Sequence, residues 1–314
     1  MTRTARLEAF AKLNLGLRVL RKRDDGYHEL RTVFQTISLA DRIGVSFEPA
    51  RRTLIQVDGT PHIPDNLVEK AARAVLDELE IAAEVRFELK KRIPAGAGLG
   101  GGSTDAAAVL LALPILAGKA IPEPRLFEMA AQLGSDVPFF LHGGTALGIG
   151  RGEELYPLPD LPRRNILLVA PDVHSSTVEA YRDLSPALTT IPLQNKLFSF
   201  QQQVWQGSHE DTANDFEEVV FARHPELARI KVRLRRAGAK PAAMTGSGSA
   251  VFGVFEDSLA VAQARQLFDG ERTFALSFLS RTRYRSAWRR ALTPHILKSN
   301  PKEDLWPPQS LYVR

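Results

Sequence analysis

Residues 94–118 read PAGAGLGGGSTDAAAVLLALPILAG, a run of glycines followed directly by small and apolar residues. The glycines stand at positions 96, 98, 100, 101 and 102, and the hydroxyl residues Ser103 and Thr104 come next. Backbone without side chains lets successive N–H groups converge on an anion, and a helix that begins there adds its positive end. Glycines can instead serve tight packing or a mobile loop. Five glycines in seven positions, with paired hydroxyls at a helix start, favour phosphate binding.

Two common phosphate-binding patterns do not fit this stretch. GAGLGG formally satisfies the dinucleotide fingerprint G-x-G-x-x-G, but the following GKAIPEPRLFEMAAQL contains no second parallel strand that ends in an acid about 20 residues on. The Walker A pattern fails because no lysine follows the glycines at the required spacing. The sequence therefore predicts an anion-binding loop of neither kind.

The segment before the glycines is rich in predicted strands. Residues 12–19 alternate between apolar and polar side chains, as in a half-buried strand, and Lys12 and Asn14 share the polar face. VFQTISLAD and IGVSFEP predict further strands, and residues 66–80 predict a helix that Asn66 caps. VRFELKKRI then predicts a strand that runs into the glycines. The local order is strand, glycine loop, helix.

The second half predicts a different arrangement of helices and strands. After a helix at about 124–133, a glycine-rich and proline-rich segment, GTALGIGRGEELYPLPDLP, is typical of a domain boundary. NILLVAP, AAMTGSGSAVFGVF and TFALSFLSR predict four strands, and STVEAYRDL and helices at about 225–237 and 258–268 lie between them. This strand-helix-strand-strand-helix-strand order is ferredoxin-like, so the fold class is α+β.

The chain has 314 residues, and single hydrophobic cores stop growing at about that size, so we expect two domains. We expect an N-terminal domain at 1–160, a C-terminal domain at 161–290 and an irregular tail at 291–314, which contains four prolines.

The composition indicates in which cellular compartment the protein works and which classes of partner it binds. No cysteine is present, which excludes disulfides and thiolate metal sites and favours a reducing, cytoplasmic setting. The N-terminus lacks the apolar core of a signal peptide, and the longest apolar run is too short to span a membrane, so no membrane association is expected. The net charge of +5 is small for the length. The basic run RTRYRSAWRR at 281–290 is interpreted as a solvent-exposed face rather than as a nucleic-acid site.

Candidate catalytic residues follow from what phosphoryl transfer to a hydroxyl requires. The reaction needs a group that accepts the hydroxyl proton and a cation that offsets charge. Asp136 is the candidate for the first, although an Asp before Val-Pro is more often a helix cap. Lys12 is the candidate cation, although a strand lysine usually faces solvent. The seven histidines show no H-E-x-x-H spacing, and no G-x-S-x-G motif occurs, which disfavours metal and serine hydrolases.

The sequence resembles the GHMP kinases, the superfamily of galactokinase, homoserine kinase and mevalonate kinase. PAGAGLGGGSTDAA resembles their phosphate loop, and AKLNLGLRVLRKRDDGYHELRTVFQ, GSDVPFFL, NDFEEVV and TGSGSAVFGVF extend the resemblance over residues 5–290. The DGYH segment is similar to that of the members whose small-molecule substrate carries a cytidine diphosphate group. The resemblance implies an N-terminal domain with a left-handed strand-helix-strand crossover, a ferredoxin-like C-terminal domain and an active site between them.

The resemblance also implies residue roles and cofactors. It implies phosphorylation of the 2-hydroxyl of a cytidine diphosphate-linked methylerythritol, in non-mevalonate isoprenoid biosynthesis, with ATP and Mg²⁺ as cofactors. Lys12 and Asp136 would form the catalytic pair, Tyr27 and His28 would hold the cytidine, and Asn14 and Thr177 would be further substrate contacts. The nucleotide would contact Lys91, Asn66 and the loop formed by Pro94, Ala95, Gly96, Ala97, Gly98, Leu99, Gly100, Gly101, Gly102, Ser103 and Thr104.

Two alternatives stay open at this point. One is a GHMP kinase for another small alcohol, such as homoserine or mevalonate. The other is a non-catalytic ligand sensor of the same fold that contacts nucleic acid through the basic run, against which the presence of both Lys12 and Asp136 argues. The metal ligands and the oligomeric state are not predicted.

Overall fold

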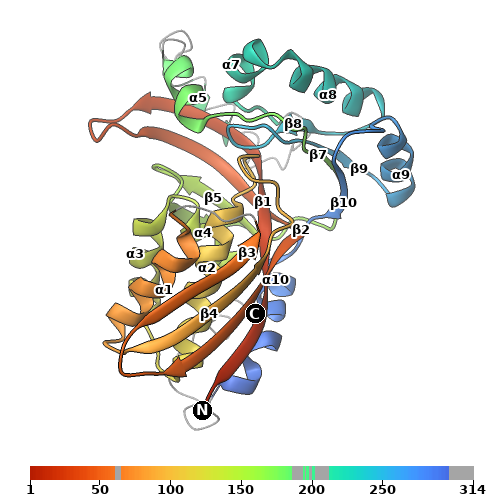
Figure 1. Cartoon of the computed structure of the whole chain (residues 1–314). Helices are drawn as coiled ribbons and strands as arrows, with labels where there is room; N and C mark the ends of the chain where they lie inside the picture. The colour runs from red at the N-terminus through yellow and green to blue at the C-terminus, as the bar shows by residue number, and fades with distance from the viewer. Residues whose placement is uncertain (61–64, 186–193, 195, 198–199, 202–211, 297–314) are drawn as a thin grey trace.

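The computed structural model describes residues 1–60, 65–185, 194, 196–197, 200–201 and 212–296. Within these residues the chain forms two sheets, each with its own helices, stacked one above the other in Figure 1. This mixed arrangement confirms the α+β fold class expected from the sequence.

The first sheet has six strands and one parallel connection. Its members are β1 (Arg3–Lys22), β2 (His28–Pro49), β3 (Leu54–Thr60), β4 (Ala83–Lys90), β5 (Thr145–Ile149) and β6 (Glu154–Pro157). The order is β3-β4-β2-β5-β6, and β1 pairs antiparallel with β2. β3 and β4 are parallel neighbours joined by α1 (Leu67–Glu78), which makes β3-α1-β4 the crossover unit.

β1 and β2 correct two expectations about the strands. The sequence predicted separate short strands, whereas the chain forms two strands of 20 and 22 residues. β1 is also buried on both faces from Ala9 to Leu17, not half-buried. Leu13 and Leu15 pack against the sheet of the second domain. On the opposite face Lys12 and Asn14 are buried as well, and Asn14 Oδ1 accepts hydrogen bonds from Lys12 Nζ and Thr245 Oγ1. Register shifts between Phe10 and Lys12, and between Asn14 and Gly16, bend the strand where it passes between the domains.

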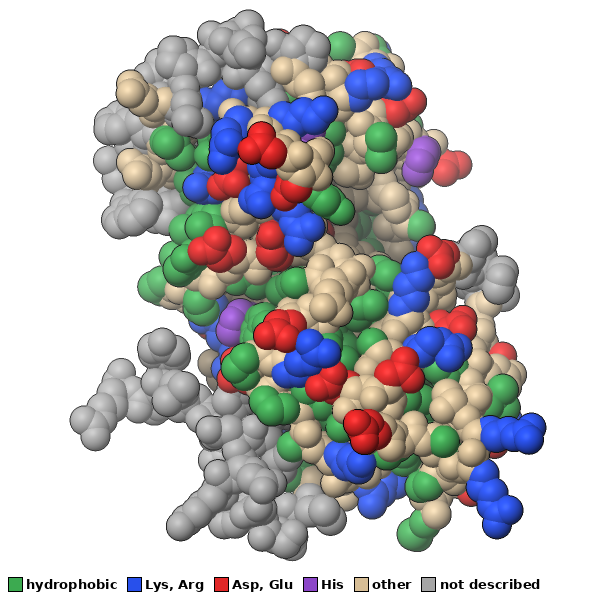
Figure 2. Space-filling view, turned by 90° about the vertical axis from the view of Figure 1, so that its left-hand side faces the viewer, with side chains coloured by type: hydrophobic (Ala, Val, Ile, Leu, Met, Phe, Trp, Pro, Cys, Tyr) green, Lys and Arg blue, Asp and Glu red, His purple; other side chains and the backbone are tan. Residues whose placement is uncertain are grey.

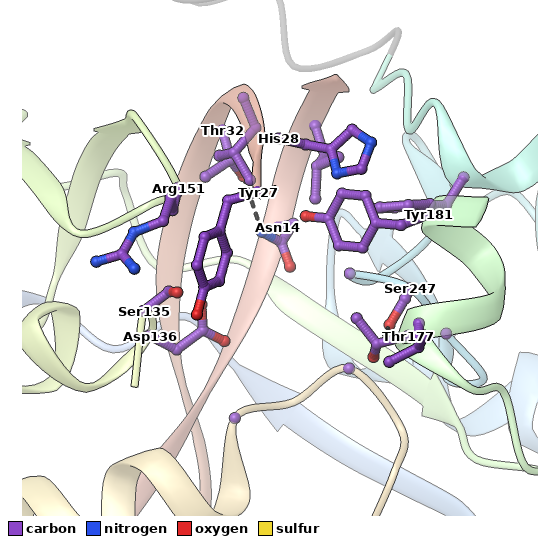
Figure 3. A pocket seen from close by; sticks show the side chains of 18 of the residues that line it. Asn14, Tyr27, His28, Thr32, Ser135, Asp136, Arg151, Thr177, Tyr181 and Ser247 are labelled. Atoms are coloured by element: carbon purple, nitrogen blue, oxygen red, sulfur yellow. Dashed lines mark hydrogen bonds between the residues drawn. The ribbon is translucent and has the colours of Figure 1, made fainter. Parts of the chain in front are cut away.

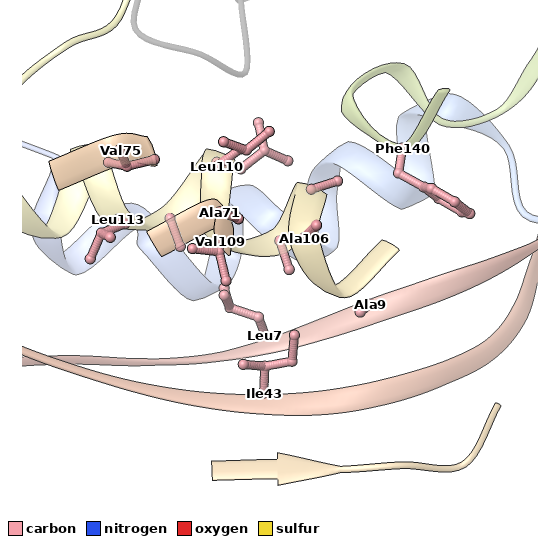
Figure 4. Close-up of a cluster of buried hydrophobic side chains, with 14 of the residues drawn as sticks. Leu7, Ala9, Ile43, Ala71, Val75, Ala106, Val109, Leu110, Leu113 and Phe140 are labelled. Atoms are coloured by element: carbon pink, nitrogen blue, oxygen red, sulfur yellow. The ribbon is translucent and has the colours of Figure 1, made fainter. Parts of the chain in front are cut away.

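The helix after the glycines is the centre of the first core. α2 (Gly101–Ala117) buries every residue from Thr104 to Leu116, as expected for a helix that is apolar on all sides. Figure 4 shows Val109 of α2 above Leu7 and Ile43 of the sheet, with Val75 of α1 nearby. α3 (Glu123–Leu133) and α4 (Val137–His142) complete this layer. The helix predicted at about 124–133 is confirmed as α3, and Gly134 follows its last residue.

The second sheet confirms the ferredoxin-like prediction. β7 (Asn165–Val169), β8 (Ala242–Met244), β9 (Val251–Phe255) and β10 (Thr273–Ser277) pair antiparallel in the order β10-β7-β9-β8. The helices are α5 (Thr177–Leu184), α7 (Phe216–Arg223), α8 (Pro225–Arg236) and α9 (Ser258–Gln266). The sequence did not predict α7. Most of the polar stretch around 201–215 lies outside the described residues.

The basic run at 281–290 forms a helix whose arginines at 283, 289 and 290 are solvent-exposed, as interpreted, but whose other side is a buried apolar face that the sequence did not predict. α10 (Arg281–Leu292) continues into a 3₁₀ turn (Thr293–His295) and lies along β1 in Figure 1. Tyr284, Trp288 and Leu292 are buried in the core of the first domain. The basic residues stand between these apolar anchors, which recur every four residues. Residues 281–292 therefore pack with the first domain, although the sequence placed most of them in the second; tail residues 297–314 lie outside the described residues.

None of the helices in the described part of the chain is long and apolar enough to cross a membrane. On the face seen in Figure 2, basic and acidic side chains are interspersed.

Candidate active site

A cavity of about 800 Å³ opens between the two domains. Its walls come from β1, the β1–β2 turn, the glycine loop, the start of α4, α5 and the loop between β8 and β9. Nine residues that the sequence or the resemblance singled out line it: Lys12, Asn14, Tyr27, His28, Gly96, Gly98, Gly100, Asp136 and Thr177. Figure 3 shows Asn14, Asp136 and Thr177 at the edge of one space, although they lie on three separate elements.

Lys12 is a buried cation at the floor of this cavity. Its side chain is only 4% exposed, and Nζ donates to Asn14 Oδ1 at 2.7 Å. Nζ also lies 3.4 Å from Asp136 Oδ2 and 5.4 Å from the centre of the Phe34 ring. A lysine that meets a carboxylate, an amide oxygen and an aromatic face is held in one place. The prediction that Lys12 and Asn14 share a face of β1 is confirmed.

Asn14 connects Lys12 to the rest of the site. Its Nδ2 donates to Thr32 Oγ1 at 2.8 Å, so its oxygen must face Lys12. Its backbone N–H donates to Thr245 Oγ1 at 3.1 Å, across the interface between the domains. Because the oxygen and the nitrogen of the Asn14 amide are both hydrogen-bonded, the amide has one fixed orientation and holds Lys12 Nζ in place.

Asp136 occupies the cap position of α4 without acting as a cap. It makes no side-chain hydrogen bond to the helix, and its backbone is in the right-handed helical region. Its carboxylate instead points to Lys12 and keeps about a third of its surface exposed. The common interpretation of an Asp before Val-Pro therefore does not apply, and the carboxylate is open to a ligand.

The glycine loop lines the cavity and also packs closely against other parts of the protein. Gly96, Gly98 and Gly100 line the cavity with positive φ angles of 64°, 74° and 73°. A Cβ on Gly98 would lie 2.1 Å from Thr245 O, and one on Gly100 would lie 2.7 Å from the Phe140 ring. Packing thus explains part of the glycine content, which the sequence assigned mainly to phosphate binding. The N-terminus of α2 still follows directly, with its first-turn N–H groups near the cavity.

Several of the expected nucleotide contacts are not at the cavity surface. Thr104 and Leu99 are buried, so their side chains do not reach the cavity, and Ala97 is nearly buried at the edge of a neighbouring groove. Pro94 and Ala95 line the same groove. Ser103 is partly exposed in the first turn of α2.

Lys91 and Asn66 have structural partners. Lys91 Nζ contacts Asp41 and lies 2.6 Å from Asp105 Oδ2, which ties the end of β4 to β2 and α2. Burial raises the pKa of Asp105 to about 7; Lys91 acts in the opposite direction, and Asp41 adds to the increase. Asn66 caps α1, accepting the Val68 N–H at 3.0 Å. Neither lines the cavity that holds Lys12.

Aromatic side chains form the far end of the cavity. The His28 ring stacks on Tyr181 of α5, with centroids 4.5 Å apart and planes at 21°, and Nε2 lies 3.3 Å from Ser185 Oγ. Burial, aided by the charge of Lys22, lowers the pKa of His28, which favours the neutral ring. Tyr27 precedes His28 in the chain, lies across the cavity from Tyr181 in Figure 3 and is 52% exposed. Thr177 Oγ1 is 2.7 Å from Ser247 Oγ at the adjoining edge.

Sequence reasoning missed several residues of the cavity. Tyr181 was interpreted only as part of an amphipathic helix, and Arg151 only as part of a domain boundary. The TGSGS segment, which supplies Thr245 and Ser247, was interpreted as a hairpin turn. The available signal was the second glycine cluster. Among the described residues, the lining includes four cations and one carboxylate: Lys12, Lys22, Arg151, Arg182 and Asp136.

The described residues offer little to a bound metal ion. They contain no group of three or more His, Asp or Glu side chains placed to hold one. Mg²⁺ commonly uses one or two carboxylates together with water and substrate phosphates. The described residues therefore fit an Mg²⁺ ion that is held mainly by water and substrate phosphates, with one or two protein carboxylates.

Comparison with known proteins identifies the family. The family model for the GHMP kinases N terminal domain matches residues 66–144, and that for the GHMP kinases C terminal domain matches residues 201–269. The 4-diphosphocytidyl-2-C-methyl-D-erythritol kinase of Solibacter usitatus (strain Ellin6076) is 55% identical over 316 residues, covering 99% of this chain and 98% of that protein.

Solved structures agree. A crystal structure of 4-(cytidine 5'-diphospho)-2C-methyl-D-erythritol kinase matches with a TM-score of 0.73 and 38% identity, covering 88% of this chain and 99% of that one. A homoserine kinase from Cytophaga hutchinsonii shares the fold with a TM-score of 0.67 at 18% identity, covering 87% of this chain and 94% of that one. Identity of 55% across nearly the whole chain shows that this protein belongs to the 4-diphosphocytidyl-2-C-methyl-D-erythritol kinase family of the GHMP kinases.

Proposed function

We propose that the protein transfers the γ-phosphoryl group of ATP to the 2-hydroxyl of 4-diphosphocytidyl-2-C-methyl-D-erythritol. This reaction belongs to the non-mevalonate route to isopentenyl diphosphate. The proposal rests on full-length similarity to a kinase of that name and on one observation of the site. The Lys12–Asp136 pair lies in the same cavity as the glycine loop and the Tyr27–His28 turn.

The charge of the cavity supports an anionic substrate. Lys12, Lys22 and Arg182 line it together with one carboxylate, Asp136, and Arg151 adds a guanidinium whose charge is already paired with Glu153. A diphosphate-linked substrate and ATP both bring negative charge, which such a cavity attracts and holds. Neither homoserine nor mevalonate carries a diphosphate, so the cavity suits the cytidyl substrate better.

Asp136 and Lys12 would carry the proton chemistry. Asp136 would accept the proton of the attacking hydroxyl as its oxygen bonds to the γ-phosphorus and the bond to the β-phosphate oxygen breaks. Lys12, whose Nζ lies 3.4 Å from Asp136 Oδ2, would offset charge on the developing alkoxide. Asn14 would orient Lys12 for this task.

ATP would bind along the glycine loop. The first-turn N–H groups of α2 and the partly exposed Ser103 are the donors available to its phosphates. Mg²⁺ bound to those phosphates would neutralise charge on the transferring group. Tyr27, His28 and Thr177 would hold the cytidine end of the acceptor.

Product mass tests the proposal. The protein is incubated with ATP and, separately, with the cytidyl substrate, mevalonate and homoserine, and each acceptor is analysed by mass spectrometry. We expect one added phosphoryl group on the cytidyl substrate alone, located at its 2-hydroxyl. Phosphorylation of mevalonate or homoserine without the cytidyl substrate would overturn the proposal.

A pair of variants tests the assignment of the cytidine wall. Tyr27→Ala and His28→Ala should each raise KM for the cytidyl substrate by about 5- to 150-fold, the range of one lost base–aromatic stack of 1–3 kcal/mol. KM for ATP should stay within about twofold. Tyr156→Ala is the matched control, because Tyr156 is an equally exposed tyrosine on β6 outside the cavity. Unchanged KM values for the acceptor in both variants would refute the assignment.

A further inference from the structure

Arg151 stands on a turn that the first sheet fixes in place. The turn joins β5 to β6, and its two glycines, Gly150 and Gly152, have φ angles of 68° and 106°. Gly150 O accepts the Leu30 N–H at 2.8 Å, and the Gly152 N–H donates to Ile149 O at 2.9 Å. The backbone that carries Arg151 is therefore anchored to Leu30 of β2, a strand that begins at His28.

Glu153 orients the Arg151 side chain. Arg151 Nε donates to Glu153 Oε1 at 3.0 Å, and the Arg151 backbone N–H donates to Glu153 Oε2 at 2.7 Å. The two side chains are about a quarter exposed. One carboxylate that binds both the guanidinium and the backbone of the same residue fixes the direction of the guanidinium plane.

The oriented guanidinium lies on the ring of Tyr27. Arg151 Cζ is 4.6 Å from the ring centroid, within the range of a cation–π contact. Figure 3 shows the two side chains together at one wall of the cavity, with Tyr181 at the opposite wall.

Tyr27 has a fixed backbone but an exposed side chain. Its N–H donates to Asp25 Oδ1 at 3.1 Å, and its carbonyl oxygen accepts the Arg23 N–H at 2.8 Å. Its side chain is nevertheless half exposed, and a tyrosine in that position keeps rotamer freedom that ligand binding must remove. The contact from Arg151, which comes from a different hairpin, restricts that freedom beforehand.

We propose that Arg151 is a positioning residue of the substrate site: held by Glu153, its guanidinium stacks on Tyr27 and keeps that ring in place to stack with the nucleobase of the acceptor. This inference rests on the proposed function, because it assumes that Tyr27 contacts the cytidine. It assigns no chemical step to Arg151. Removal of Arg151 should weaken acceptor binding and leave the phosphoryl transfer itself unaffected.

Steady-state kinetics of Arg151→Ala is the first test. KM for the cytidyl substrate should rise about two- to fivefold, the size of one cation–π contact at a partly exposed site, while kcat and KM for ATP stay unchanged. Glu153→Gln should move KM in the same direction by less. Arg86→Ala is the matched control, since Arg86 is also ion-paired with one glutamate but lies on β4 away from the cavity. An unchanged acceptor KM in Arg151→Ala overturns the proposal.

A double mutant separates positioning from direct contact. In the Tyr27→Ala background, adding Arg151→Ala should cause no further rise in KM, because the ring on which Arg151 acts is gone. A further rise of the full size would mean that Arg151 contacts the acceptor itself, which overturns the proposal.

Calorimetric titration gives a result that does not depend on turnover. Arg151→Ala should weaken cytidine and cytidine 5'-diphosphate by the same factor; weakening of the diphosphate alone would mean phosphate recognition and would overturn the proposal. Because cytidine binding needs no turnover, this titration judges the role of Arg151 even if the wild type fails to phosphorylate the acceptor. That failure would contradict the proposed function instead.

Discussion

Lys12 shows how one side chain can be charged, buried and functional. It lies at the floor of the cavity, and Asn14 and Asp136 supply the partners that a buried ammonium requires. The period-two pattern of the strand predicted that Lys12 and Asn14 would share a face, because side chains two apart in a strand point the same way. No such local rule links Lys12 to Asp136, 124 positions later, and only the resemblance indicated that pair.

Asp105 carries a prediction about pH. Burial raises its pKa from 3.8 to about 7 in the folded protein, so the folded state binds the proton more tightly than the unfolded chain does. The stability linked to this group is therefore fully present below about pH 4 and is lost as pH rises through about 7. Asparagine at this position cannot release a proton, so Asp105→Asn should flatten this dependence between pH 5 and 8.

Urea denaturation of the wild type and Asp105→Asn between pH 5 and 8 measures this effect. Asp58→Asn, a change of an exposed carboxylate on β3, is the control and should keep the wild-type slope. A difference between Asp105→Asn and the wild type that does not change with pH would show that Asp105 does not titrate in this range.

The glycine loop is the element on which the whole site depends. The sequence predicted its place between a strand and a helix correctly. It could not show that Thr245, 147 residues beyond Gly98, presses its carbonyl oxygen against the loop, because that contact forms only when the two domains pack. The same packing explains why the half-buried pattern of β1 underestimated its burial.

Gly98→Ala tests the packing of this loop. The new Cβ would lie 2.1 Å from Thr245 O at a φ of 74°, so backbone strain and a clash both arise. Gly238→Ala is the matched control, with a φ of 97° and no heavy atom within 4 Å of the added Cβ. The control should lose about 1–2 kcal/mol of unfolding free energy from the positive φ alone.

Gly98→Ala should lose about 1–3 kcal/mol more than the control because of overpacking. It should also lose most kinase activity, which Gly238→Ala should retain. Equal losses of stability in the two variants, measured by urea denaturation, would show that the contact with Thr245 does not constrain the loop.

On the scale of the whole molecule, the chain returns to its first domain at the end. After the ferredoxin-like domain, α10 packs along β1, and Tyr284 and Trp288 are 1% and 2% exposed. The ferredoxin-like order could be predicted because each of its strands and helices has its own local pattern. The placement of α10 could not be predicted, since its buried face has only one apolar residue per turn and the residues between are mostly arginines.

Trp288→Ala measures what α10 contributes. Loss of a buried tryptophan should lower the unfolding free energy by about 3–5 kcal/mol. Arg289→Ala, a change of the next and exposed residue of the same helix, should stay within about 0.5 kcal/mol of the wild type. Chemical denaturation of both variants tests this, and a small effect of Trp288→Ala would mean that the first core does not depend on α10.

Lys12 of β1 and Asp136 at the start of α4 lie 124 positions apart in the sequence, yet Lys12 Nζ is 3.4 Å from Asp136 Oδ2. The kcat of Asp136→Asn with ATP and the cytidyl substrate tests the catalytic role of this pair most directly. Asparagine keeps the shape of the side chain but cannot accept the proton, so kcat should fall about 10²- to 10⁴-fold while KM for the acceptor changes little. A kcat near that of the wild type would contradict the account.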